Sequence, residues 1–90
     1  MKITRKIIIT NKKSLSILTC IKLVDLAKEF ECDLWVGDKS ISVNLKHLVE
    51  LLSLVALKGT ELTLTAEGDD AGKAVDAIAS FLREQLIQVQ

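Results

Sequence analysis

The alternation of short strand-like and helix-like segments constrains this chain more than any other feature. Within 90 residues, runs with an apolar side chain at every second position are separated by runs with helical spacing. The first pattern is typical of half-buried strands and the second of amphipathic helices. The chain contains no proline and no tract rich in glycine and serine, so nothing marks a linker. The segment order is β-α-β-β-α-β-α, and we expect one domain over residues 1–90.

Turn residues and changes of period set the expected boundaries. The pattern predicts strands over residues 4–10, 32–36, 40–43 and 61–66. It predicts helices over residues 17–30 and 48–54, and a last helix that starts at residues 68–70 and continues to 82. We expect a cap for the first helix at Ser14 or Ser16, and one for the second at Asn44. Asp69 and Asp70 suit the positive end of the last helix dipole.

The expected core is aliphatic, because only 3% of the residues are aromatic. Each helix presents one apolar stripe at helical spacing. The stripes are Cys20, Leu23, Val24, Ala27 and Phe30 in the first helix, Leu48, Leu51, Leu52 and Val55 in the second, and Ala71, Ala74, Val75, Ile78 and Leu82 in the third. Amphipathic helices alternating with strands in so short a chain predict an α+β fold with one sheet and helices on one face. By pattern alone, a ferredoxin-like module fits nearly as well.

Composition excludes several classes of function. Twelve basic and twelve acidic residues cancel, which argues against a nucleic-acid binder that relies on a strong positive charge. No apolar run approaches the ~20 residues that a membrane-spanning helix needs, and no secretion signal is evident, so we expect a cytoplasmic protein. Cys20 and Cys32 lack the spacing of a metal site and are interpreted as buried apolar residues. We therefore expect no metal and no cofactor.

The whole chain resembles HPr, the histidine-containing phosphocarrier of the bacterial sugar phosphotransferase system. The most specific segments are Val43-Asn44-Leu45-Lys46, a short apolar helix followed by Ser53-Leu54, and the run from Lys58 to Gly68. The resemblance implies an open-faced β-sandwich, in which three helices cover one face of a four-stranded antiparallel sheet.

The phosphorylation site of that family departs from its usual pattern here. The family has glycine, a hydrophobic residue, histidine, any residue, arginine, proline and alanine at the start of the first helix. This chain has the segment Ser14-Leu15-Ser16-Ile17-Leu18-Thr19-Cys20. Ser16 therefore occupies the phosphoacceptor position and Leu18 the phosphate-holding position. A serine ester gives up its phosphoryl group far less readily than a phosphohistidine, and Leu18 offers no cation to phosphate oxygens.

His47, the single histidine, occupies the position of the regulatory serine that a kinase phosphorylates in some bacteria. Its ordinary interpretation is a surface or capping residue, and its functional one is a relocated phosphoacceptor or a pH-sensitive contact. Ser16 is similarly interpreted as a helix cap or, alternatively, a regulatory phosphorylation site.

The same resemblance implies that five positions face outward and contact partner proteins. All five are apolar in this chain: Ile17, Leu18, Ile21, Val49 and Leu52. Monomers rarely expose a contiguous patch of this kind, although local tucking of one or two residues into the core is the alternative. We expect a non-enzymatic docking or regulatory module that binds phosphotransferase-system components or a second copy of itself. The remaining alternatives are a phosphoacceptor using Ser16 or His47, and an unrelated ligand-binding regulatory domain.

Overall fold

Strands and helices alternate along the chain in the expected order. The computed structural model describes residues 1–8, 16–38, 40–57, 61–85 and 88–89. Its helices are α1 (Ile17–Ala27), α2 (Leu48–Leu57) and α3 (Ala71–Glu84). Its strands are β1 (Lys2–Ile8), β2 (Asp33–Gly37), β3 (Ser42–Asn44), β4 (Glu61–Glu67) and β5 (Gln88–Val89).

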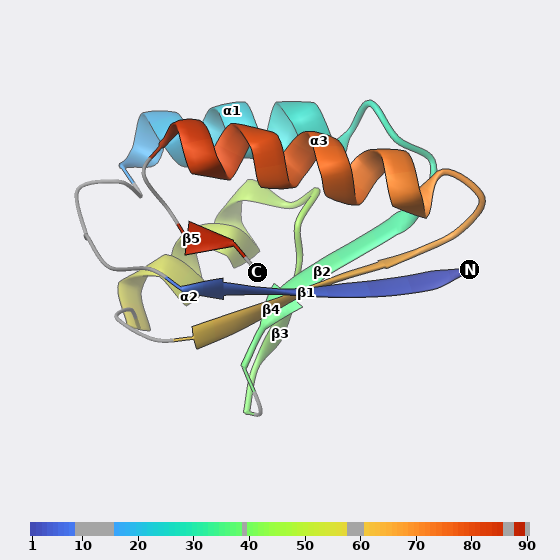
Figure 1. Cartoon of the computed structure of the whole chain (residues 1–90). Helices are drawn as coiled ribbons and strands as arrows, with labels where there is room; N and C mark the ends of the chain where they lie inside the picture. The colour runs from blue at the N-terminus through green and yellow to red at the C-terminus, as the bar shows by residue number, and fades with distance from the viewer. Residues whose placement is uncertain (9–15, 39, 58–60, 86–87, 90) are drawn as a thin grey trace.

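The strands form one antiparallel sheet in the order β3-β2-β4-β1-β5. The four strands expected from the sequence are its main body, and all three helices pack on one face of it (Figure 1). The two-residue strand β5 was not expected. It pairs Val89 with Ile7 and Gln88 with Ile8, which covers one end of β1. Only tertiary pairing defines so short a strand, because two residues carry no readable period.

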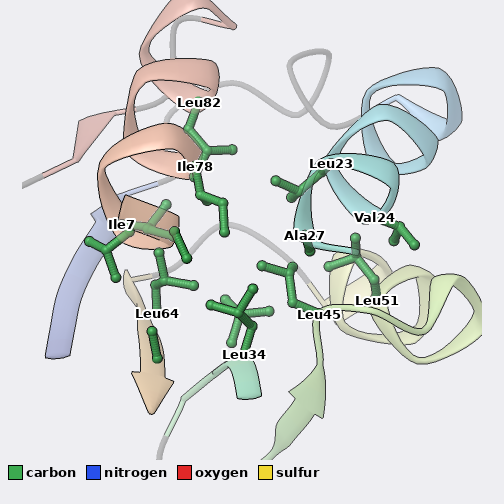
Figure 2. Packing of buried hydrophobic residues seen from close by; sticks show 14 of the residues in the cluster. Ile7, Leu23, Val24, Ala27, Leu34, Leu45, Leu51, Leu64, Ile78 and Leu82 are labelled. Carbon is green, nitrogen blue, oxygen red and sulfur yellow. The ribbon is translucent and has the colours of Figure 1, made fainter. Parts of the chain in front are cut away.

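The helix-covered face of the sheet forms one side of the core. In an antiparallel pair, residues directly opposite each other share a face. Ile7 lies opposite Leu62, and Val36 lies opposite Leu64, so all four point toward the helices. Figure 2 shows Leu34 and Leu64 directed at Ile78 of α3 and Leu23 of α1. The predicted stripes of α1 and α3 are buried, except that Phe30 is only half-buried against the core.

Several predicted boundaries were wrong, and pairing accounts for those of the strands. β1 begins at Lys2, two residues early, because Lys2 pairs with Glu67 at the end of β4. Residues 9 and 10 lie outside the described part of the chain. β2 is shifted by one residue relative to the expected 32–36 and ends on Gly37, whose partner is Ser42.

The third strand starts later than expected, and Ile41 is 38% exposed. The carboxylate of Asp38 accepts hydrogen bonds from the N–H groups of Ser40 at 2.7 Å and Ile41 at 2.9 Å, which makes this stretch a turn. A Cβ atom at Gly37 would lie 1.9 Å from the Ile41 carbonyl oxygen, so the turn requires glycine there.

Helix α1 ends at Ala27 rather than at residue 30. After the last helical turn, the N–H of Glu29 donates to the Leu26 carbonyl and that of Phe30 donates to the Ala27 carbonyl. Each hydrogen bond spans three residues instead of four, which tightens the chain. α2 is longer than predicted and continues to Leu57. Of its expected stripe, Leu51 is buried, Leu48 and Leu52 are half-buried, and the side chain of Val55 lies outside the described part.

Two polar residues expected at helix starts make other contacts: Asn44, predicted as a cap, and Asp70, predicted at the positive end of the α3 dipole. The side chain of Asn44 accepts from the Lys46 N–H at 2.9 Å, which closes a turn before α2 instead of capping the helix. Asp70 occupies the cap position of α3 but makes no side-chain cap bond. Its carboxylate instead accepts from the N–H groups of Glu31 and Cys32, each at 2.9 Å.

Candidate functional site

Ser16 caps the first turn of α1. Its backbone is extended, with φ −64° and ψ 163°, and its Oγ accepts a hydrogen bond from the N–H of Thr19 at 3.2 Å. This geometry satisfies one of the amide groups that a helix leaves without an internal partner. Of the two serines considered for this cap, Ser16 fills it, while Ser14 lies outside the described residues. The hydroxyl at the position that the sequence resemblance assigns to the phosphoacceptor is thus part of the helix cap.

Thr19 connects this cap to α3. Only 7% of the residue is exposed. Its Oγ1 donates a hydrogen bond of 3.4 Å to Gln85 Oε1 and lies 3.1 Å from Ser16 Oγ. Gln85 is the C-cap of α3, directly after the last helical residue. Sequence reasoning missed both Thr19 and Gln85 as members of the site. Hydroxyl residues three positions apart at a helix start gave a signal for the first contact, but no signal pointed to the contact with Gln85.

The outward side of α1 is apolar. Ile17 is 65% exposed, Leu18 60% and Ile21 39%. On α2, which packs against α1, Val49 is 78% exposed, whereas Leu52 is half-buried and packs against the core. We call these five residues the apolar face. The helical spacing of Ile17 and Ile21 places both beside the stripe that turns inward, so the first helix carries two apolar sides.

His47 lies immediately before α2, and its carbonyl accepts the N–H of Leu51 at 3.0 Å. The ring Nδ1 is 2.6 Å from Glu50 Oε2, and the other Glu50 oxygen accepts from the Asn44 N–H at 3.2 Å. The hydrogen bond from His47, followed by the one from the Asn44 amide, lowers the pKa of Glu50. Both side chains are exposed. Among the described residues, no hydrogen bond or ion pair joins His47 to Ser16.

A small acidic cavity of about 380 Å³ lies at the N-terminal end of α3, the end opposite Gln85. Its lining is Glu31, Cys32, Asp33, Glu67, Gly68, Asp69 and Asp70. Hydrogen bonds from backbone amides, above all that of Glu31, lower the pKa of Asp70. Within the described ranges, no group of three acidic, cysteine or histidine side chains has the arrangement of a metal site.

Both cysteines are buried and unbridged, as expected for small apolar residues. Burial raises the pKa of Cys20. Burial, together with a hydrogen bond to Asp70, raises the pKa of Cys32 to about 11. Neither thiol therefore has the character of a reactive thiolate near neutral pH. In the described part of the chain, none of the helices has the length and apolar character needed to span a bilayer.

Comparison with known proteins supports the resemblance found in the sequence. A family model described as "PTS HPr component phosphorylation site" matches residues 3–84. The HPr-like protein Crh of Bacillus subtilis (strain 168) is 29% identical over 84 residues, which cover 93% of this chain and 99% of the relative.

Solved structures give the same result. The histidine-containing phosphocarrier protein of a mycoplasma superposes with a TM-score of 0.82 at 29% identity, covering 98% of this chain and 99% of the other. A crystal structure of Bacillus subtilis Crh, described as a swapped dimer, gives a TM-score of 0.70 at 31% identity over 82% of this chain and 85% of its own. The chain therefore belongs to the HPr family of phosphotransferase-system components.

Proposed function

We propose that this chain is a protein-docking or regulatory member of the HPr family, neither an enzyme nor a phosphocarrier. The observation that carries the proposal is the joint state of Ser16 and Leu18. The hydroxyl of Ser16 caps α1, and Leu18 exposes an apolar side chain where the family places its phosphate-holding cation. The HPr fold is retained, while serine and leucine stand at the positions to which the family resemblance assigns the phosphoacceptor histidine and the phosphate-holding arginine.

Chemistry at Ser16 supports the first half of the proposal. A carrier must both accept and release a phosphoryl group, and a phosphoserine ester releases it much less readily than a phosphohistidine. An arginine binds phosphate through two charge-assisted hydrogen bonds to different oxygens, whereas an alkyl side chain makes no hydrogen bond. Phosphorylation of Ser16 would also have to displace the hydroxyl contacts with Thr19.

Exposure of the apolar face supports the second half. Burying a leucine, isoleucine or valine side chain contributes roughly 1.5–3 kcal/mol, so leaving Ile17, Leu18 and Val49 in water has a cost that a partner removes. Contiguous apolar patches on soluble domains commonly mark protein interfaces. Two related structures, one of them Crh, are described as dimers, which supports self-association as one use of such a face.

A second candidate function rests on the His47–Glu50 pair. A carboxylate 2.6 Å from Nδ1 orients the imidazole and favours the tautomer with its proton on that nitrogen, which leaves the lone pair of Nε2 free in the neutral ring. That is the electronic arrangement of a nucleophilic histidine. In this alternative, His47 accepts a phosphoryl group directly before α2, whereas Ser16 lies directly before α1.

Intact mass distinguishes the two functions. The chain is incubated with phosphoenolpyruvate and enzyme I of the phosphotransferase system, beside an HPr that retains its histidine as a positive control. We expect phosphorylation of the control and no mass gain for this chain. A gain of one phosphoryl group that disappears in His47→Gln would establish the second candidate, and a gain that disappears in Ser16→Ala would establish a carrier with altered chemistry.

A further inference from the structure

Side chains from two distant parts of the chain meet where α1 begins. Thr19 Oγ1 donates to Gln85 Oε1 at 3.4 Å and lies 3.1 Å from Ser16 Oγ. A hydroxyl has one proton, so the proton of Thr19 is used on Gln85 and the Ser16 hydroxyl must donate to Thr19. We propose that these three residues form a hydroxyl latch, in which Thr19 and Gln85 are positioning residues that hold the first turn of α1 against the end of α3.

Burial explains why the bond to Gln85 matters. Thr19 is the one buried polar residue of the described chain, at 7% exposure. A buried hydroxyl without a partner is unfavourable, because it loses its hydrogen bonds to water and gains none. Gln85 is placed to supply the acceptor because it is the C-cap of α3, where its N–H donates to the Leu82 carbonyl at 3.0 Å. Ser16 Oγ is the local partner of the Thr19 hydroxyl, and the acceptor for its proton comes from a residue 66 positions away.

The latch also gives the hydroxyls of Ser16 and Thr19 a shared purpose. The two replacements at the former phosphorylation site complement each other: the Thr19 N–H donates to Ser16 Oγ at 3.2 Å, and the Ser16 hydroxyl donates back to Thr19. A proline at position 19 would provide neither the N–H nor the hydroxyl. The segment that carries the phosphorylation site in the family therefore contributes, in this chain, to the hydroxyl latch between α1 and α3.

If the apolar face docks a partner, as proposed above, the latch also affects how readily that face binds. Ile17 and Leu18, which are 65% and 60% exposed, lie between Ser16 and Thr19 in the turn that the latch fixes. A surface that is already ordered loses less conformational entropy when a partner binds. The latch thus keeps the most exposed part of the apolar face in one conformation.

Native-state hydrogen exchange, followed for individual amides by NMR, tests the latch on the chain alone. The variants are Thr19→Val, which removes the hydroxyl at nearly constant shape, Thr19→Ser, which retains it, and Gln85→Met, which removes the acceptor. Thr63→Val, at an exposed position of β4, is the matched control. The Leu34 amide in β2 reports on global unfolding.

In Gln85→Met, we expect the Thr19 and Cys20 amides to exchange about tenfold faster, the factor that corresponds to about 1.4 kcal/mol. Leu34 should be unaffected. Thr19→Val should accelerate the Gln85 amide similarly, and Thr19→Ser should retain most of the protection. The double variant Thr19→Val/Gln85→Met should be no worse than the more affected single variant.

Three results would overturn the latch. The first is an unchanged exchange rate of the Cys20 amide in Gln85→Met, and the second is equal acceleration of the Leu34 amide, which would indicate general destabilisation. The third is an additive effect of the two substitutions in the double variant. Because no partner is present in these measurements, a negative result leaves the docking function standing, and that function is tested separately through Leu18.

Discussion

The ammonium group of Lys46 donates a hydrogen bond of 2.6 Å to the carbonyl oxygen of Phe30. This contact joins the residue two places before α2 to the turn that follows α1. From the other side, Asp70 holds the amides of Glu31 and Cys32 in the same turn. The turn between α1 and β2 is therefore fixed by one cation and one carboxylate from separate elements, which explains why the helix stops at Ala27 despite a helical pattern that continues to Phe30.

Lys46→Met should lower the free energy of unfolding by about 1–2 kcal/mol. The substitution keeps most of the aliphatic stem but removes a charged, half-buried donor, and hydrogen bonds to charged groups contribute about 1.5–3 kcal/mol. Urea denaturation followed by circular dichroism measures the change. Lys22→Met, at an exposed position of α1, is the control and should stay within about 0.5 kcal/mol. Equal effects of the two variants would contradict a specific function for Lys46.

Leu18→Asp should leave the free energy of unfolding within about 0.5 kcal/mol, because the side chain is 60% exposed. The charge should weaken self-association, measured by sedimentation velocity, and the binding of immobilised enzyme I. Leu23→Ala is the buried comparison on the same helix and should cost about 2–5 kcal/mol. Unchanged binding by Leu18→Asp in both assays would reject the apolar face as a docking surface.

Restoring the family residues with Ser16→His, Leu18→Arg and Thr19→Pro should yield a folded protein. We expect a loss of about 1–2 kcal/mol in stability, because the hydroxyl contacts of Ser16 and Thr19 disappear together. Phosphoenolpyruvate and enzyme I should then add one phosphoryl group, detected by intact mass. A triple variant that is folded by circular dichroism but remains unmodified would show that the docking surface no longer accepts enzyme I.

Acid should remove the contribution of Asp70 to stability. The pKa of this carboxyl in the folded chain lies below its ordinary value of 3.8 because backbone amides, first that of Glu31, donate to the ionised form. A carboxyl with a lowered folded pKa stabilises the fold above its unfolded pKa, near 3.8, and loses that effect as the pH falls through the folded value.

Asp70→Asn should therefore flatten the decline of unfolding free energy below about pH 4, measured by urea titrations at several pH values. Asp69→Asn, at the exposed neighbouring residue, is the control and should retain the wild-type slope. If Asp70→Asn also retains that slope, the amide bonds of Asp70 do not contribute to acid sensitivity.

Cys32 should resist alkylation while the chain is folded. Its pKa of about 11, against an ordinary value of 9.0, leaves a roughly 100-fold smaller thiolate fraction at pH 8. Iodoacetamide labelling read by mass spectrometry should modify Cys32 only at the rate of unfolding, and rapidly in urea. Labelling of the native protein as fast as a model thiol would contradict the buried, Asp70-bonded environment.

The sequence alone determined the type and order of the main elements, and its resemblance to HPr distinguished this fold from a ferredoxin-like one. The two-residue period of Glu61–Ala66 and the helical spacing of Ala71, Ala74, Val75, Ile78 and Leu82 are local signals, because each element must present one apolar side to a common core. The resemblance to HPr likewise depended on residues read in order, as did the exposed, apolar character expected for Ile17, Leu18, Ile21 and Val49. Leu52, expected on the same outward side, is half-buried.

Tertiary structure decided where elements stop and how their ends are joined. The pairing of Lys2 with Glu67, the two-residue strand at Gln88–Val89 and the contact between Thr19 and Gln85 all join residues that are more than sixty positions apart. The spacing of residues within one segment cannot predict these contacts, because hydrogen bonds form between groups that are close in space, however far apart they are in the chain. Asp70 shows the same limit. The sequence predicts a carboxylate at the positive end of the α3 dipole, but only the fold brings the amides of Glu31 and Cys32 to it.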